Sequence, residues 1–208
     1  LDTARTLLDE LRADGIDDDR LCLLMKTLEQ TCEPDIALRN LVDIIKALQS
    51  QGRDFHQVIT DDAGLVRLVT VLGVSDGMGK LMRFRPELVM AAASDSCESH
   101  LYNHAQRRAH VLEAVGADPA DNRMPKATKP LAEAATALRQ TYRKQLAAIM
   151  AQDATADDPI EIQPRISQEL SDLADAALEG ALAIARNEVD GSEHVRFAII
   201  GMGKLGAR

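Results

Sequence analysis

Residues 195–208, VRFAIIGMGKLGAR, decide how the rest of the chain is interpreted. The first six positions are rich in β-branched and aromatic residues, and Gly201 ends the apolar run. A short buried strand that enters a tight glycine turn has this pattern. No other segment shows it clearly, so the sequence predicts a single C-terminal strand that follows a helical body.

The turn after this predicted strand contains three glycines, Gly201, Gly203 and Gly206, together with Lys204. Glycine has no side chain, so the backbone can come close to a phosphate, and the lysine adds a positive charge. The turn is therefore a candidate phosphate-binding site. The alternative is an ordinary chain reversal with a solvent-facing lysine, because glycine turns after strands are common.

Two phosphate-binding motifs can be compared with this turn. A Walker A loop is excluded, because Ala198 stands where its first glycine belongs and Leu205 stands where serine or threonine should bind magnesium. The spacing G-x-G-x-x-G matches the dinucleotide fingerprint, which also requires a following helix, a second strand and an acidic residue roughly 20 positions later. A dinucleotide-binding enzyme stays open as an alternative, although so long a helical segment before a first Rossmann strand would be unusual.

Apolar residues recur with the helical period of 3.6 along most of the chain before residue 195. Pro34 opens the clearest of these helices, and Gly52 follows its end. Its inward positions are Leu38, Leu41, Ile44, Ile45 and Leu48. The expected fold is mainly α, a helical bundle or array with one C-terminal β-strand.

Residues 117–129 contain two prolines and several polar side chains between two long periodic segments. This composition predicts a linker that separates a helical region, residues 1–116, from a second region, residues 130–208. In the second region, the alanine-rich segment 166–186 predicts a helix whose small side chains allow close packing on the terminal strand.

The composition restricts the partners of the protein. A net charge of −9 argues against nucleic acid, because phosphate neutralisation needs an excess of lysine and arginine. Three cysteines without C-x-x-C spacing indicate neither a disulfide framework nor a zinc ribbon. No apolar run reaches the roughly 18 to 20 residues that a bilayer requires. We therefore expect a cytoplasmic protein that contacts neither membrane nor nucleic acid.

Three further segments contain candidate functional residues. Cys97, His100 and His104 share a helical face with spacing that could hold zinc, but a fourth ligand is missing and a packing or surface role is favoured. The turn 77–80, GMGK, lacks a preceding strand and is interpreted as a helix start.

The third segment is a basic stripe formed by Arg139, Arg143 and Lys144 on a predicted helix. Most stripes of this kind are solvated faces. The functional alternative is contact with a nucleotide phosphate or with an acidic partner.

The block GMGKLGAR at 201–208 resembles the start of a nucleotidyltransferase domain in the bifunctional glutamine synthetase adenylyltransferase/adenylyl-removing enzyme family. Three upstream blocks occur in the order of that family's N-terminal, adenylyl-removing half. They are an apolar helix at 64–73 followed by Ser75 and Arg85-Pro86-Glu87, the pattern L-R-x-x-Y-R-x-x-L-x-x-I at 138–149, and LSDLADAALEGALAIAR at 170–186. The first sixty residues contribute little to the resemblance.

This resemblance implies an enzyme that moves AMP between nucleotide and a tyrosine of glutamine synthetase. The N-terminal half would remove AMP by phosphorolysis to yield ADP, under the control of a PII-type signalling protein. The C-terminal strand would begin a polymerase-β-like domain, in which Gly201, Gly203, Lys204 and Gly206 approach the phosphates of ATP or ADP. Two aspartates that hold Mg²⁺ in the family are expected beyond Arg208, so no catalytic or metal-binding residue is assigned within this chain.

Two functional hypotheses follow for the chain itself. The first is a piece of the adenylyl-removing half, cut at the start of its nucleotidyltransferase domain and inactive alone. The second is a helical regulatory or docking module that binds glutamine synthetase or a PII-type protein without chemistry.

Overall fold

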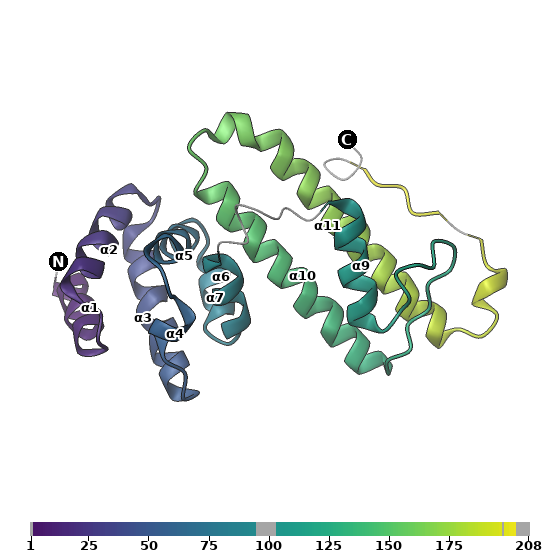
Figure 1. Ribbon diagram of the computed structural model, residues 1–208, viewed down its shortest axis with the longest axis horizontal. Coiled ribbons are helices and arrows are strands. Elements are labelled where there is room, and N and C mark those ends of the chain that lie inside the picture. The colour runs from purple at the N-terminus through teal and green to yellow at the C-terminus, as the bar shows by residue number, and fades with distance from the viewer. Residues whose placement is uncertain (1, 95–102, 197, 203–208) are drawn as a thin grey trace. The chain divides into compact units, whose positions relative to one another are not determined.

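The regular structure of the protein is helical wherever the computed structural model describes it, in residues 2–94, 103–196 and 198–202 (Figure 1). The chain divides into two units by its internal contacts. Unit 1 comprises residues 1–99 and 150–157, and unit 2 comprises residues 100–149 and 158–208. The predicted mainly helical fold is therefore confirmed.

Unit 1 is built from seven described helices that precede residue 95. They are α1 (Asp2–Ala13), α2 (Asp18–Gln30), α3 (Pro34–Ser50), α4 (Phe55–Val58), α5 (Asp62–Val74), α6 (Asp76–Met82) and α7 (Pro86–Ala93). Side-chain caps fix several of the starts. Asp17, Asp61 and Ser75 each accept a hydrogen bond from a backbone N–H in the first turn of the helix that follows.

Helix α5 forms the centre of unit 1, because it is apolar on nearly all sides. Its contacts are with α2, α3, α6 and α7. Five of its side chains are at most 1% exposed, namely Leu65, Leu68, Val69, Val71 and Leu72. A helix that is apolar all round can only be stable when other elements enclose it, which explains its central position.

Unit 2 contains α9 (His104–Val115), most of α10 (Leu131–Ala154), α11 (Pro159–Glu188) and a short 3-10 helix, η1 (Ser192–His194). Figure 1 shows α10 and α11 running in opposite directions. Gly180 on α11 allows close packing, since a Cβ there would lie 2.5 Å from Val111 Cγ1 on α9 and 3.0 Å from Leu138 Cδ1 on α10. The small residues of α11 are thus used for contact between helices.

Residues 117–129 belong to unit 2 and do not separate the two units. Ala127 is buried, and its N–H donates to the carbonyl of Ala183 on α11 at 3.0 Å. The Thr128 hydroxyl donates to the carbonyl of Gly116 at 2.7 Å, which closes the segment at its base. The chain passes between the two units near residues 100, 150 and 158. The composition of residues 117–129 is typical of a linker but does not reveal the bonds that hold this segment on unit 2.

The predicted C-terminal strand is not seen among the described residues. Val195, Arg196 and residues 198–202 have no regular secondary structure, and Phe197 lies outside the described residues. A strand requires a partner that receives its backbone hydrogen bonds. The described parts of the chain contain no second strand to serve as that partner.

Among the described residues, no helix combines the length and the apolar character needed to cross a bilayer.

Candidate functional site

The glycine turn predicted to bind phosphate is described only at its beginning. Gly201 and Met202 are exposed, whereas Gly203, Lys204 and Gly206 lie outside the described residues. Residues 199–202 face one side of α11 across an open pocket of about 430 Å³. The α11 side of this pocket is formed by Asp175, Leu178, Glu179, Leu182 and Arg186.

The α11 side of this pocket is one continuous helical face, because positions 175, 178 and 179, 182 and 186 fall on successive turns of the helix. It is partly apolar, and Leu178 is 38% exposed. The residues that face it, Ile199 and Ile200, are apolar and exposed as well. The pocket therefore joins an uncovered apolar stripe to the segment that leads into the glycine turn.

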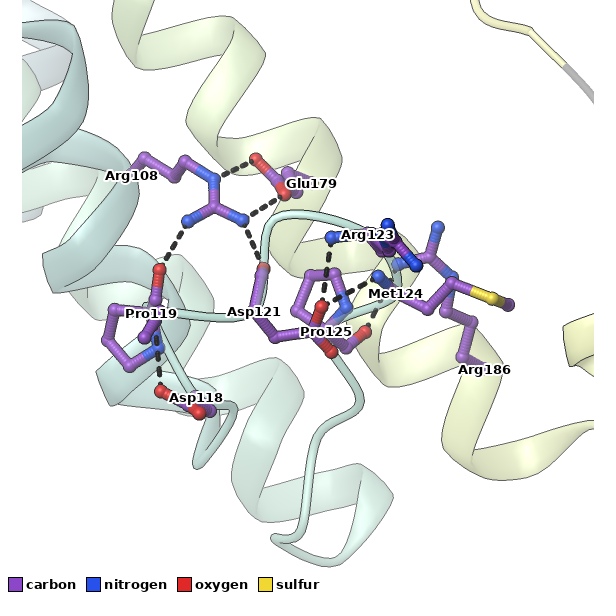
Figure 2. Close-up of polar contacts among 10 residues, drawn as sticks. Arg108, Asp118, Pro119, Asp121, Arg123, Met124, Pro125, Glu179 and Arg186 are labelled. Atoms are coloured by element: carbon purple, nitrogen blue, oxygen red, sulfur yellow. Dashed lines mark hydrogen bonds and ion pairs between the residues drawn. The ribbon is translucent and has the colours of Figure 1, made fainter.

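Arg108 on α9 fixes the segment 117–129 to α11 (Figure 2). Its Nε and Nη2 donate to the two carboxylate oxygens of Glu179 at 2.8 and 2.7 Å. Its Nη1 and Nη2 also donate to the carbonyls of Pro119 and Asp121 at 2.6 and 2.7 Å. One planar guanidinium thus connects two helices and a loop, an arrangement that a lysine could not reproduce.

The far end of the same loop is fixed by Asp121 and Arg186, as Figure 2 shows. The Asp121 carboxylate accepts hydrogen bonds from the backbone N–H groups of Met124 and Arg123, and these bonds lower its pKa from the ordinary value. Arg186 Nη1 on α11 donates to the carbonyl of Pro125 at 3.1 Å. The loop therefore has a defined conformation along its length.

A buried ion pair connects the three helices of unit 2. Arg107 is 2% exposed and Glu169 is 5% exposed, and Arg107 Nη2 donates to Glu169 Oε2 at 2.8 Å. Arg107 Nη1 donates to Gln145 on α10 at 2.9 Å. Burial raises the pKa of the Glu169 carboxyl, although Arg107 and Arg165 act to lower it. The hydrogen bonds of this pair connect helices α9, α10 and α11, so we assign it a structural role.

The candidate zinc face is described only at His104, because Cys97 and His100 lie outside the described residues. His104 Nδ1 lies 3.5 Å from Asp172 Oδ1, and the His104 side chain is half exposed. No group of three or more potential metal ligands occurs in the described parts of the chain. The segment 77–80 is part of α6, which Ser75 caps, so it is a helix start.

The basic stripe on α10 carries no ion pair with any carboxylate of the described residues. Arg139 and Lys144 are exposed, and Arg143 is half-buried. Arg139 Nη2 donates to the Thr136 hydroxyl at 3.3 Å, within the same helix. These three cations are therefore not neutralised by a carboxylate in the part of the chain that the structure describes.

Residues 65–208, more than half of the chain, match the family described as glutamate-ammonia ligase adenylyltransferase. The chain belongs to this adenylyltransferase family. The resemblance traced from residue 64 to the glycine turn is thereby confirmed. The members are enzymes, and the family name gives glutamate-ammonia ligase, which is glutamine synthetase, as the protein on which they act.

Similar proteins named bifunctional glutamine synthetase adenylyltransferase/adenylyl-removing enzyme occur in several bacteria. The chain is 68% identical to that of Bifidobacterium longum strain DJO10A over its whole length, which is 19% of the relative. It is 34% identical to that of Cutibacterium acnes over 93% of the chain and 19% of the relative. The chain thus spans about a fifth of the length of the curated relatives it matches. No solved structure gives a significant match.

The two ion pairs that connect the helices of unit 2 could not be predicted from the sequence. Arg108 and Glu179 are 71 positions apart, and Arg107 and Glu169 are 62 apart, so no local pattern connects them. One local signal was that Arg107 and Arg108 stand one helical turn before Val111 and Leu112, which places them near the buried face of α9.

Proposed function

We propose that the chain is a helical part of the adenylyl-removing half of a glutamine synthetase adenylyltransferase/adenylyl-removing enzyme. The observation that carries this proposal is the position of GMGKLGAR at 201–208, after the last long helix α11 and inside the segment that matches the family. In the complete enzyme, residues 195–200 would form the first strand of a polymerase-β-like nucleotidyltransferase domain. Unit 2 would then be the helical support on which that domain is mounted.

The complete enzyme would release AMP from a tyrosine of glutamine synthetase by phosphorolysis, yielding ADP, and a PII-type protein would regulate the direction. Gly201, Gly203, Lys204 and Gly206 are proposed to approach the nucleotide phosphates, because glycines allow close backbone contact and the lysine supplies charge. The two aspartates that would hold Mg²⁺ are proposed to lie in another segment of the complete enzyme. We therefore assign no residue of this chain to the metal and no catalytic step to the chain itself.

One experiment tests whether the 208-residue chain has activity alone. The purified chain is incubated with adenylylated glutamine synthetase, phosphate and Mg²⁺, and the release of ADP is measured. We expect no ADP above background, while the longer protein that contains the chain is active. Release of ADP by the chain alone would show that the assignment of the metal-binding carboxylates to another segment is wrong.

A second experiment tests the glycine turn in the longer protein. Lys204→Ala should remove a charge-assisted contact worth about 1.5 to 3 kcal/mol and weaken the dependence on phosphate, with little change in thermal stability. Gly206→Val should block phosphate approach. If Lys204→Ala left the deadenylylation kinetics and their phosphate dependence unchanged, only a structural turn would remain for that lysine.

The alternative function is a docking module for glutamine synthetase or a PII-type protein. The observation in its favour is the basic stripe, because Arg139, Arg143 and Lys144 remain without carboxylate partners among the described residues of an acidic chain. Binding of the 208-residue chain to immobilised glutamine synthetase should weaken when these three residues are replaced by glutamine. Arg53, an exposed residue of unit 1, is the control. If Arg53→Gln weakened binding to glutamine synthetase as much as the triple variant, a specific role of the stripe would be excluded.

A further inference from the structure

A second pocket of unit 2, of about 480 Å³, lies where the loop 117–129 meets the end of α11. It adjoins the pocket beside Gly201, because Leu182 and Arg186 line both, but none of residues 199–202 lines it. Its lining residues are Arg123, Met124, Leu182, Ala185, Arg186, Val189, Ser192, Val195 and Arg196. Three arginines line this pocket, and none of the described side chains that line it carries a carboxylate.

These arginines differ from the buried arginines of α9 in their pairing. Arg107 and Arg108 each form an ion pair with a glutamate at 2.7 to 2.8 Å. Arg123, Arg186 and Arg196 form none with the carboxylates of the described residues, although acidic residues outnumber basic ones 33 to 24 in the chain. Within the described part of the chain these three guanidinium groups therefore have no direct carboxylate partner, although backbone hydrogen bonds, and after them the charge of Arg186, lower the pKa of Asp121.

The geometry also holds one of these guanidinium groups in place. Arg186 is half-buried, and its Nη1 donates to the carbonyl of Pro125, so the side chain is tied to the loop that carries Arg123. Figure 2 shows Arg123, Met124 and Arg186 at the end of the loop opposite to Arg108. The nearby Asp121 carboxylate accepts two backbone hydrogen bonds and does not line the pocket.

We propose that Arg123, Arg186 and Arg196 bind a small phosphate-bearing ligand in this pocket. Guanidinium groups match the geometry of phosphate oxygens and can donate to them in pairs. Met124, Leu182, Val189 and Val195 supply an apolar wall, and the volume lies in the range of small-molecule sites. This combination suits a nucleoside phosphate, with the charge on the arginines and the base against the apolar wall.

The site is separate from the glycine turn and does not depend on the function proposed above. Two of its three arginines, Arg123 and Arg186, belong to the loop 117–129 and to α11, so most of its charge does not come from the segment that leads into the turn.

Isothermal titration of the 208-residue chain with ATP tests the proposal. EDTA removes free divalent metal ions, so any binding observed does not depend on a metal. Adenosine and pyrophosphate are titrated in parallel. The double variant Arg123→Gln/Arg196→Gln should bind ATP at least about tenfold more weakly, and raised salt should weaken binding to the unchanged chain. Both side chains are exposed, so the helices should be unaffected, which circular dichroism checks. Arg53→Gln, an exposed arginine outside the pocket, is the matched control and should bind ATP like the unchanged chain.

The titrations with ATP and pyrophosphate distinguish a site for nucleotides from a site for the phosphate group alone. Pyrophosphate bound as tightly as ATP would support recognition of the phosphate group alone, and tighter ATP binding would support a nucleotide. Three results would overturn the proposal: no binding of ATP or pyrophosphate, equal binding of adenosine and ATP, or equal weakening by Arg53→Gln. A loss of binding in Lys204→Ala that the double arginine variant does not share would move the site to the glycine turn and also refute it.

Discussion

Replacing one member of the buried Arg107–Glu169 pair should destabilise unit 2 strongly, whereas replacing both should not. Each single change leaves the opposite charge buried without its partner, which costs about 3 to 5 kcal/mol. The raised pKa of Glu169 indicates that desolvation of its carboxylate outweighs the attraction of Arg107 and Arg165. The intact pair therefore contributes little net stability, and Arg107→Met/Glu169→Leu should recover most of the loss.

Urea unfolding followed by tyrosine fluorescence measures this effect in unit 2 alone. The chain has no tryptophan, and its two tyrosines, at positions 102 and 142, fall within the sequence of unit 2. Tyr142 packs against the cluster of Ile149, Ile166 and Leu173, so its fluorescence should respond when α10 and α11 separate. With a slope of roughly 1 to 3 kcal/mol per molar urea, a loss of about 3 kcal/mol moves the midpoint by about 1 M or more.

A matched control uses the exposed partner of the same glutamate. Arg165 Nε lies 3.4 Å from Glu169 Oε1 one turn away, and its side chain is half exposed, so Arg165→Met should cost less than about 1 kcal/mol. The reasoning is refuted if Arg107→Met costs no more than Arg165→Met. It also fails if the double variant loses as much stability as the sum of its two single variants.

Three further predictions concern the packing of the helices and the loop. Gly180→Ala should lower the free energy of unfolding by about 1 to 3 kcal/mol, and with it the thermal midpoint, because its methyl group meets Val111 on α9. Gly77→Ala meets only one atom, at 4.0 Å, and should leave the midpoint unchanged; thermal unfolding followed by circular dichroism compares the two variants. Arg108→Lys cannot hold Glu179 and two loop carbonyls together, so trypsin should cleave the loop faster than in the unchanged chain, and equal rates would contradict the clamp. The pKa of Asp121 is lowered, so its carboxylate stabilises the loop fully above pH 3.8, its ordinary pKa, and this stabilisation is lost as the pH falls through the lower pKa of the folded state. Amide hydrogen exchange in the loop, measured against pH, should show this loss. Asp121→Asn should abolish the pH dependence.

Much of the helical organisation and the family assignment could be obtained from the sequence. Helix α3 is an example, because Pro34 and the spacing of its apolar side chains depend on neighbouring positions only, and the helix begins at that proline. The glycine turn was recognisable for the same reason, since its residue types and spacing are local. Its role in binding phosphate remains a prediction, because most of the turn lies outside the described residues.

Only the tertiary structure decided how residues 117–129 are used and which charges are paired. The prolines and polar residues of this segment are typical of a linker, but Arg108, Ala183 and Arg186 hold it on the helices of unit 2. Ion pairs across 62 and 71 positions depend on how helices pack, and helix packing brings together side chains with no local sequence relation. For the same reason, the pocket with Arg123, Arg186 and Arg196 exists only in three dimensions, because its charges come from a loop, a helix and the segment that follows.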